Sequence, residues 1–230
     1  MKRISFMCAL FVSTAILAQS TINQNLGDFT VLKVYNGIEV ELIKSVDQKI
    51  EITGEKSEMV KIKNVNKTLK LSLPFSLKLA NNSADGKVLI KLYYNKSITI
   101  IDANEGATIT SKDFNQDIIE LSAQEGAFIN ITTQTNYLIV KAISGGIIKV
   151  SGTAKNQEVD VDLYGIYHGY NLISAGNSTV NSGTGAKAEI SAVQTLRAKV
   201  GFGGTIFYKG NPEVVKEKKV IGGIIEKRNE

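Results

Sequence analysis

Glu105-Gly106-Ala107-Thr108-Ile109 is the stretch that decides the fold, because the chain repeats it as Glu125-Gly126-Ala127-Phe128-Ile129 and then as Ser144-Gly145-Gly146-Ile147-Ile148. The copies place a glycine at positions 106, 126 and 146, a period of 20 residues. Looser copies follow at Ala175-Gly176-Asn177, Gly185-Ala186-Lys187 and Gly203-Gly204-Thr205. A period of about 20 residues is typical of a solenoid, in which the short strands of each coil stack on those of its neighbours.

Two-residue alternation of apolar and polar residues fills most of the chain, and helical patterning is almost absent after residue 20. In residues 38–42, for example, isoleucine, valine and leucine alternate with glutamate. Such runs are typical of half-buried strands, since branched side chains fit a pleated sheet better than a helix. The sequence therefore predicts an all-β fold, a parallel β-solenoid with coils of about 20 residues, over residues 29–212.

Residues 29–210 would provide roughly nine such coils. A β-sandwich is the alternative, since it also has short strands separated by turns. The shared phase of the repeats favours the solenoid, and the Asn-Gly pair of a tight hairpin occurs only at Asn36-Gly37. We predict that residues 79–86 form the longest loop and that residues 213–230 form a capping strand or tail.

The first 18 residues have the layout of a secretory signal peptide. Lys2 and Arg3 precede an apolar stretch at residues 4–17, and Ala18 followed by Gln19 suits cleavage by signal peptidase. The apolar stretch, like every later one, is shorter than the ~20 residues of a transmembrane helix; a buried N-terminal strand or helix is the alternative. We therefore expect a protein exported to the periplasm, the cell surface or the medium, with a flexible leader at residues 19–28.

Composition excludes several classes of function. Cys8, the only cysteine, lies in the predicted signal peptide, so the mature chain would have neither a disulfide nor a reactive thiol. The chain has 27 Lys and Arg against 22 Asp and Glu, interspersed along most of its length. That pattern is typical of an ordinary solvated surface, and it argues against nucleic acid as a partner.

The only histidine, His168, lies in an aromatic segment at residues 164–170. Tyr164, Tyr167, His168 and Tyr170 could form a small binding site, or the histidine could act as a general base; the alternative is a polar turn with exposed aromatic residues. One histidine without a mature cysteine leaves a zinc site short of ligands. No serine or cysteine lies in a nucleophile motif, so we predict no catalytic residue.

Glu158, Asp160 and Asp162 alternate along one predicted strand, which places their carboxylates on one face. Such a row could bind calcium, because neighbouring like charges repel one another and favour a cation or a lysine nearby. The sequence has no Asp-x-Asp-x-Asp-Gly loop and no Gly-Gly-x-Gly-x-Asp nonapeptide. A solvated strand face is therefore the alternative, and we predict no other cofactor.

Four segments together resemble a known bacterial family, the "putative auto-transporter adhesin, head GIN domain" proteins that are common in Bacteroidetes. They are Gly27-Asp28-Phe29-Thr30-Val31-Leu32 with Val34-Tyr35-Asn36-Gly37-Ile38-Glu39-Val40, then Ile50-Glu51-Ile52-Thr53-Gly54-Glu55, the recurrent x-Gly-Ala turns, and the closing Gly203-Gly204-Thr205-Ile206-Phe207-Tyr208-Lys209-Gly210-Asn211-Pro212. The resemblance spans about residues 27–212. It implies an exported, right-handed β-helix-like head with an adhesive role, and it carries over no catalytic residue.

The sequence departs from the family pattern at Glu105 and Glu125, where the family has serine, and at residues 164–170, which interrupt the repeat. These departures put any shared ligand site in doubt. The first hypothesis is a non-enzymatic binding module, an adhesin that presents a solenoid face to a glycan or a protein. A structural envelope protein that associates with itself is the second, and a polysaccharide lyase or hydrolase using the Glu158 row is the third.

Overall fold

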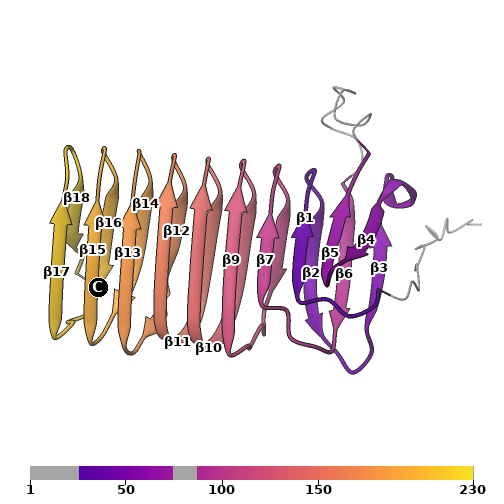
Figure 1. Cartoon of the computed structure of the whole chain (residues 1–230), viewed down its shortest axis with the longest axis horizontal. Helices are drawn as coiled ribbons and strands as arrows, with labels where there is room; N and C mark the ends of the chain where they lie inside the picture. Colours follow the sequence, from indigo (N-terminus) through magenta and orange to yellow (C-terminus); the bar gives the residue numbers. More distant parts are fainter. Residues whose placement is uncertain (1–25, 75–86, 230) are drawn as a thin grey trace, which may run out of the picture.

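The computed structural model describes residues 26–74 and 87–229, which form a flat stack of strands (Figure 1). It is a β-solenoid of about 7 turns, about 19 residues apart, with 2% helix, so the predicted all-β solenoid is confirmed. The predicted signal peptide at residues 1–18, most of the predicted leader at 19–28 and the predicted loop at 79–86 lie outside the described residues.

Each coil contributes one strand to each of two sheets, named here face A and face B. Face A runs in spatial order through β5 (Thr68–Ser72), β1 (Val31–Val34), β7 (Ile100–Ala103), β9 (Ile118–Gln124), the second halves of β10 (Phe128–Ile143) and β11 (Ile147–Asp162), β13 (Asn177–Ser182), β15 (Thr195–Val200) and β17 (Val214–Lys219). Face B runs through β6 (Leu89–Tyr94), β2 (Glu39–Lys44), β8 (Thr108–Ser111), the first halves of β10 and β11, β12 (Ile166–Ser174), β14 (Lys187–Ala192), β16 (Thr205–Lys209) and β18 (Ile224–Lys227).

The core lies between the two faces and is built from inward ladders of apolar residues in register. Because side chains alternate along each strand, every second residue points inward and meets its equivalent in the next coil. One ladder of face A consists of Leu69, Leu32, Ile101, Leu121, Val140, Val159, Val180 and Ala198, all of them buried. Burial of each large member stabilises the fold by about 1.5–3 kcal/mol relative to leaving it exposed.

The N-terminal end departs from simple stacking. The β1 and β2 strands come first in the sequence but lie between the β5/β6 layer and the β7/β8 layer. Strand β3 (Lys49–Thr53) pairs antiparallel with β6, and β4 (Lys61–Val65) pairs antiparallel with β5, so these strands cover the end of the stack (Figure 1). The expectation of nine successive coils is therefore corrected: regular 19-residue turns begin only at β7.

The chain passes from face A to face B at one edge of the stack, the upper edge in Figure 1, named here the turn edge. Glu105 with Gly106 and Glu125 with Gly126 form such turns, and φ is positive at both residues of each pair. The second residue of each turn donates its N–H to the first residue of the next turn, as from Gly106 N to Glu125 O at 3.0 Å. The turns are thus stacked in register like the strands.

Three details of the predicted repeat are wrong. In the third copy Gly145 occupies the place of Gly126, and Gly146 pairs with the position after it, so the local period is 19 rather than 20 residues. The interruption expected at residues 164–170 lies at the end of that segment and not at its start: Leu163 and Tyr164 form the turn of their coil with φ of 47° and 64°, whereas the register of β12 with its neighbours shifts after His168 and Gly169. The Ala175-Gly176 copy lies between β12 and β13, at the opposite edge.

The C-terminal end has charged residues at inward positions. The segment after residue 212 forms two strands, β17 and β18, which complete a last coil where the sequence predicted one capping strand. In register with the buried Ala198, Val200 and Tyr208 are Glu217, Lys219 and Lys227. Inward-pointing charges are a common way to stop an open sheet end from pairing with another chain.

Candidate functional site

A groove lies on face A where two glycines interrupt an outward column of side chains. The column runs Ile143, Asp162, Gly183, Gly201, Val220 from coil to coil. Because neither glycine has a side chain, the surface is hollowed between the larger residues on both sides. The groove encloses about 590 Å³.

Polar groups of both signs line this groove. Asn181 donates its side-chain N–H to Asp160 Oδ1 at 2.6 Å, which fixes both side chains on adjacent strands. Lys199 and Lys218 follow in the same outward column of the next two coils. Phe202, which is 70% exposed, stands at the rim with Val220. The groove therefore offers hydrogen-bond donors, acceptors and an apolar wall together.

The carboxylate of Asp162 supports the turn edge of the groove. Its Oδ1 accepts the backbone N–H of Leu163 at 2.8 Å and that of Thr184 in the next coil at 2.7 Å. The side chain leans across Gly183, where a Cβ would lie 2.3 Å from Oδ1. Asp162 thus holds two turns together, and Gly183 leaves the room for it.

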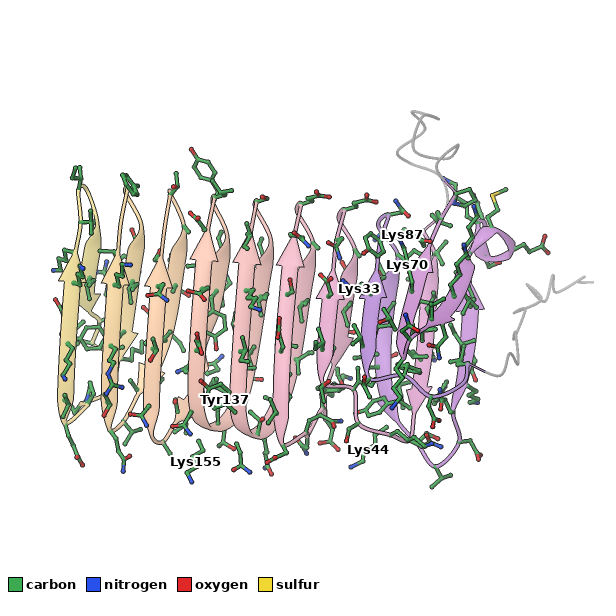
Figure 2. All side chains as sticks on the ribbon, in the orientation of Figure 1. Lys33, Lys44, Lys70, Lys87, Tyr137 and Lys155 are labelled. Carbon is green, nitrogen blue, oxygen red and sulfur yellow. The ribbon has the colours of Figure 1, made fainter. Side chains whose placement is uncertain are left out.

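The predicted carboxylate row, Glu158, Asp160 and Asp162, lies on one strand of face A, but each member has a separate partner. Glu158 accepts the hydroxyl of Tyr137 at 3.1 Å near the edge opposite the turns (Figure 2), while Asp160 and Asp162 are bound as described above. Within residues 26–74 and 87–229, no group of three or more His, Cys, Asp or Glu side chains could hold a metal ion. Calcium binding by this row stays a prediction without a preformed cluster to support it.

The four predicted binding residues do not form one site. Tyr164 stands exposed at a turn tip, whereas Tyr167 is fully buried between the faces. The Tyr167 hydroxyl donates to Gln157 Oε1 at 3.3 Å, and burial raises the pKa of this phenol. Gly169 makes room for the ring, because a Cβ there would lie 2.5 Å from a ring carbon. His168 and Tyr170 point outward on face B.

The outward residues around His168 are already satisfied by one another. Glu189 Oε2 lies 2.7 Å from His168 Nδ1, and Glu189 Oε1 lies 2.5 Å from Lys187 Nζ. Burial raises the pKa of Glu189, but the hydrogen bonds from Lys187 and His168 outweigh burial and hold this pKa below its usual value. Lys209 covers the Tyr170 ring, with Nζ 4.8 Å from its centroid. This cluster joins neighbouring strands of face B and engages Nδ1 of His168 with a carboxylate on the same face.

Sequence reasoning missed Gly183, Gly201 and Phe202 as members of a surface site. The available signal was the spacing of Gly183 and Gly201, which lie one coil apart and therefore side by side. Recognising it requires the correct phase of the repeat, which shifts by one residue at Gly145.

Comparison with known proteins gives a family and a set of similar structures. The family model described as "Putative auto-transporter adhesin, head GIN domain" matches residues 28–212. A comparison with curated proteins finds no match. A putative adhesin from Bacteroides fragilis has a TM-score of 0.80 and 18% identity, covering 90% of this chain and 96% of the other. A putative lipid binding protein from Parabacteroides distasonis has a TM-score of 0.69 and 19% identity, covering 91% and 96%.

A putative adhesin from Parabacteroides merdae is similar to the same degree, with a TM-score of 0.67, 18% identity and coverage of 92% and 96%. At this level of identity the similarity shows the fold alone. Among the described residues, no helix has the length and apolar character needed to cross a membrane.

Proposed function

The chain belongs to the auto-transporter adhesin head GIN family, and from that premise we propose that it is an exported, non-enzymatic module that binds a glycan through the groove on face A. The family and its structural neighbours are named as adhesins or as a lipid binding protein, which supports a binding role at or near the cell surface.

The observation that carries this proposal is the pair of adjacent glycines in the outward column. Other outward columns of face A present a side chain in every coil, whereas Gly183 and Gly201 open a hollow of about 590 Å³. Flanking polar side chains such as Asp160, Asn181 and Lys199 match the hydroxyls of a sugar, which both donate and accept hydrogen bonds. Phe202 supplies an aromatic ring against which the apolar side of a sugar can pack.

A glycan array followed by titration of the hits tests the proposal. The chain from residue 19 onward should bind at least one glycan, and the double variant Asp160→Ala/Asn181→Ala should lose at least about tenfold in affinity, since two hydrogen-bonding groups are removed. Lys149→Ala is the matched control, because Lys149 is exposed on face B and should leave the affinity unchanged.

Two results would contradict the proposal. One is the absence of any glycan that binds at micromolar concentration. The other is a glycan whose affinity is unchanged in Asp160→Ala/Asn181→Ala but falls in Lys149→Ala, which would move the site to face B.

The two other hypotheses from the sequence receive less support. Self-association through the C-terminal end has to overcome the inward charges of Glu217, Lys219 and Lys227, although Ile221 and Ile224 are exposed nearby. Polysaccharide cleavage would need a pair of free carboxylates, and the members of the Glu158 row are hydrogen-bonded separately. Light scattering and an assay with acidic polysaccharides would test these two roles.

A further inference from the structure

The turn edge of the last four coils carries a row of exposed side chains that is mostly apolar. Tyr164 is 69% exposed, Phe202 70% and Ile221 80%. Backbone hydrogen bonds connect these turns, from Tyr164 N to Thr184 O at 3.0 Å and from Gly203 N to Ile221 O at 3.3 Å. The turns therefore follow one another at the ~4.8 Å spacing of neighbouring strands. We name the row formed by Tyr164, Phe202 and Ile221 the turn ridge.

The backbone beneath the ridge has a conformation that bulky side chains disfavour. The φ angle is 47° at Leu163, 64° at Tyr164 and 48° at Phe202. In this left-handed region Cβ crowds the following carbonyl oxygen, so glycine and asparagine are preferred. Earlier coils follow that preference at the second turn position, with Gly106 and Gly126 in the place of Tyr164, whereas the first position is occupied by Glu105 and Glu125, also with positive φ.

At Tyr164 and Phe202 a positive φ and high exposure fall on the same residue, and burial in the core offsets neither. Ile221 shares the exposure without a positive φ. Gly185 in the next coil gives the Tyr164 ring room to lie along the ridge, since a Cβ there would lie 2.7 Å from a ring carbon. Even so the ring stays mostly in solvent. Strained backbone and exposed apolar side chains are both typical of contact sites for another molecule.

The shape of the ridge restricts what that molecule can be. Sites for small ligands are concave, whereas the ridge lies on the narrow edge of a two-sheet stack (Figure 1). Its three side chains are largely exposed there. Apolar side chains that project from an edge leave water only if the partner can surround them. A lipid bilayer accepts such side chains at its interface, where tyrosine in particular is favoured.

The charge beside the ridge indicates which kind of bilayer. Arg197 lies beside Lys216, and Lys199 beside Lys218, on the last two strands of face A. None of the four forms an ion pair with a described acidic residue. Like charges placed directly opposite one another on a sheet are destabilising, so an anionic surface would relieve their repulsion. Basic side chains next to apolar tips are the combination that binds anionic lipid surfaces.

We infer that the turn ridge inserts into the interface of a bilayer that contains anionic lipids. Lys199 and Lys218, three residues before Phe202 and Ile221, would lie closest to the headgroups, with Arg197 and Lys216 behind them. The inference goes beyond the proposed glycan site and does not depend on it. Phe202, Lys199 and Lys218 belong to both surfaces, so the variants that separate them change other residues. Tyr164 and Ile221 do not line the groove, and Asp160 and Asn181 are not part of the ridge.

Vesicle flotation tests the inference without any glycan present. The chain from residue 19 onward should float with vesicles of phosphatidylcholine and phosphatidylglycerol, and more weakly with phosphatidylcholine alone. Tyr164→Asn/Ile221→Ser should weaken binding by at least about tenfold, because two apolar side chains no longer enter the bilayer. Val193→Asn is the matched control, since Val193 is 45% exposed and lies between β14 and β15 at the opposite edge.

A charge variant separates the electrostatic contribution to vesicle binding from the contribution of the apolar side chains. Lys216→Gln/Lys218→Gln should weaken binding to the anionic vesicles alone and reduce its dependence on salt. Three results would overturn the inference: no flotation of the unaltered chain with anionic vesicles, equal binding by Tyr164→Asn/Ile221→Ser, or an equal loss in Val193→Asn. If Tyr164→Asn/Ile221→Ser loses vesicle binding but keeps glycan binding, the two sites are separate. If Asp160→Ala/Asn181→Ala loses glycan binding but keeps vesicle binding, the same conclusion follows from the other side.

Discussion

At the turn edge, the coils around Gly106 and Gly126 and the coils around Tyr164 and Phe202 form the same kind of turn with different residues. In the earlier turns glutamate takes the first position and glycine the second, both with positive φ. In the later ones the large residue Phe202 takes the first position of its turn, and Tyr164 takes the second position of its own. The hydrogen bonds between turns continue through both parts. The fold therefore requires this backbone conformation but does not require apolar side chains at the turn tips. We conclude that these side chains serve a role other than folding.

The largest expected effect comes from the close stacking that both kinds of turn share. A Cβ at Gly165 would lie 1.9 Å from Ala142 O, so Gly165→Ala should lower the free energy of unfolding by about 3 kcal/mol through overpacking. Urea unfolding followed by circular dichroism measures it. The control is Ala127→Gly, two coils earlier at the same place in the coil, which should lose only about 0.5–1 kcal/mol. If both variants lost the same free energy of unfolding, the position of Gly165 would not be closely packed.

The second prediction measures the destabilisation caused by the left-handed backbone conformation alone, at a position where packing does not change. At Gly126 φ is 73° and a Cβ would meet nothing within 4 Å, so Gly126→Ala should lower the free energy of unfolding by about 1 kcal/mol through strain alone. Gly201→Ala is the control, because a Cβ there would come no closer than 3.9 Å and its φ is not positive. Its stability should change by less than about 0.5 kcal/mol. A larger change at Gly201 would contradict the assignment of the strain to the turn tips.

A third prediction compares the two ends of the stack. Glu217→Val/Lys219→Val removes inward charges from the open last coil, and it should produce dimers or larger assemblies in light scattering, because the charges no longer block edge pairing. Lys61→Val/Lys63→Val on β4, the edge strand at the N-terminal end, is the control. Lys61 and Lys63 are exposed beside the half-buried Ile62, so they point outward, and the control should assemble less because outward charges oppose edge pairing less than inward ones. If only Lys61→Val/Lys63→Val assembled, charge would protect the N-terminal end of the stack and not the C-terminal end, which would contradict our interpretation.

The smallest effect is a pH dependence on face B. The pKa of Glu189 is held below its value in the unfolded chain, so its contribution to stability is present above the unfolded pKa and is lost as the pH falls through the folded pKa. Glu189→Gln should reduce the acid-side loss of stability by less than about 1 kcal/mol, since the pair is partly exposed. Denaturation at acidic and neutral pH measures this, and an unchanged pH profile would contradict the role given to Glu189.

The sequence predicted the solenoid because similar turns at a spacing of about 20 residues bring the strands between them into register. It missed the antiparallel pairing of β3 and β4, since alternation gives strands but not the partners they choose. The prediction that Tyr167 belongs to a surface binding site was wrong, because this side chain is buried. A tyrosine can point inward or outward, and only its position within the coil decides which. The sequence did not show that Tyr164 takes the place of Gly106 and Gly126 at the turn edge, because that equivalence needs the phase of the coil.

One experiment on Tyr164→Asn tests most directly whether the turn ridge is kept for binding rather than for folding. The account predicts a trade-off in the chain from residue 19 onward. The free energy of unfolding should rise by about 1 kcal/mol, because asparagine tolerates the left-handed conformation, while vesicle binding weakens. If the variant is less stable, or if it is more stable and binds anionic vesicles as well as the unaltered chain does, the tips serve the fold and the account is wrong.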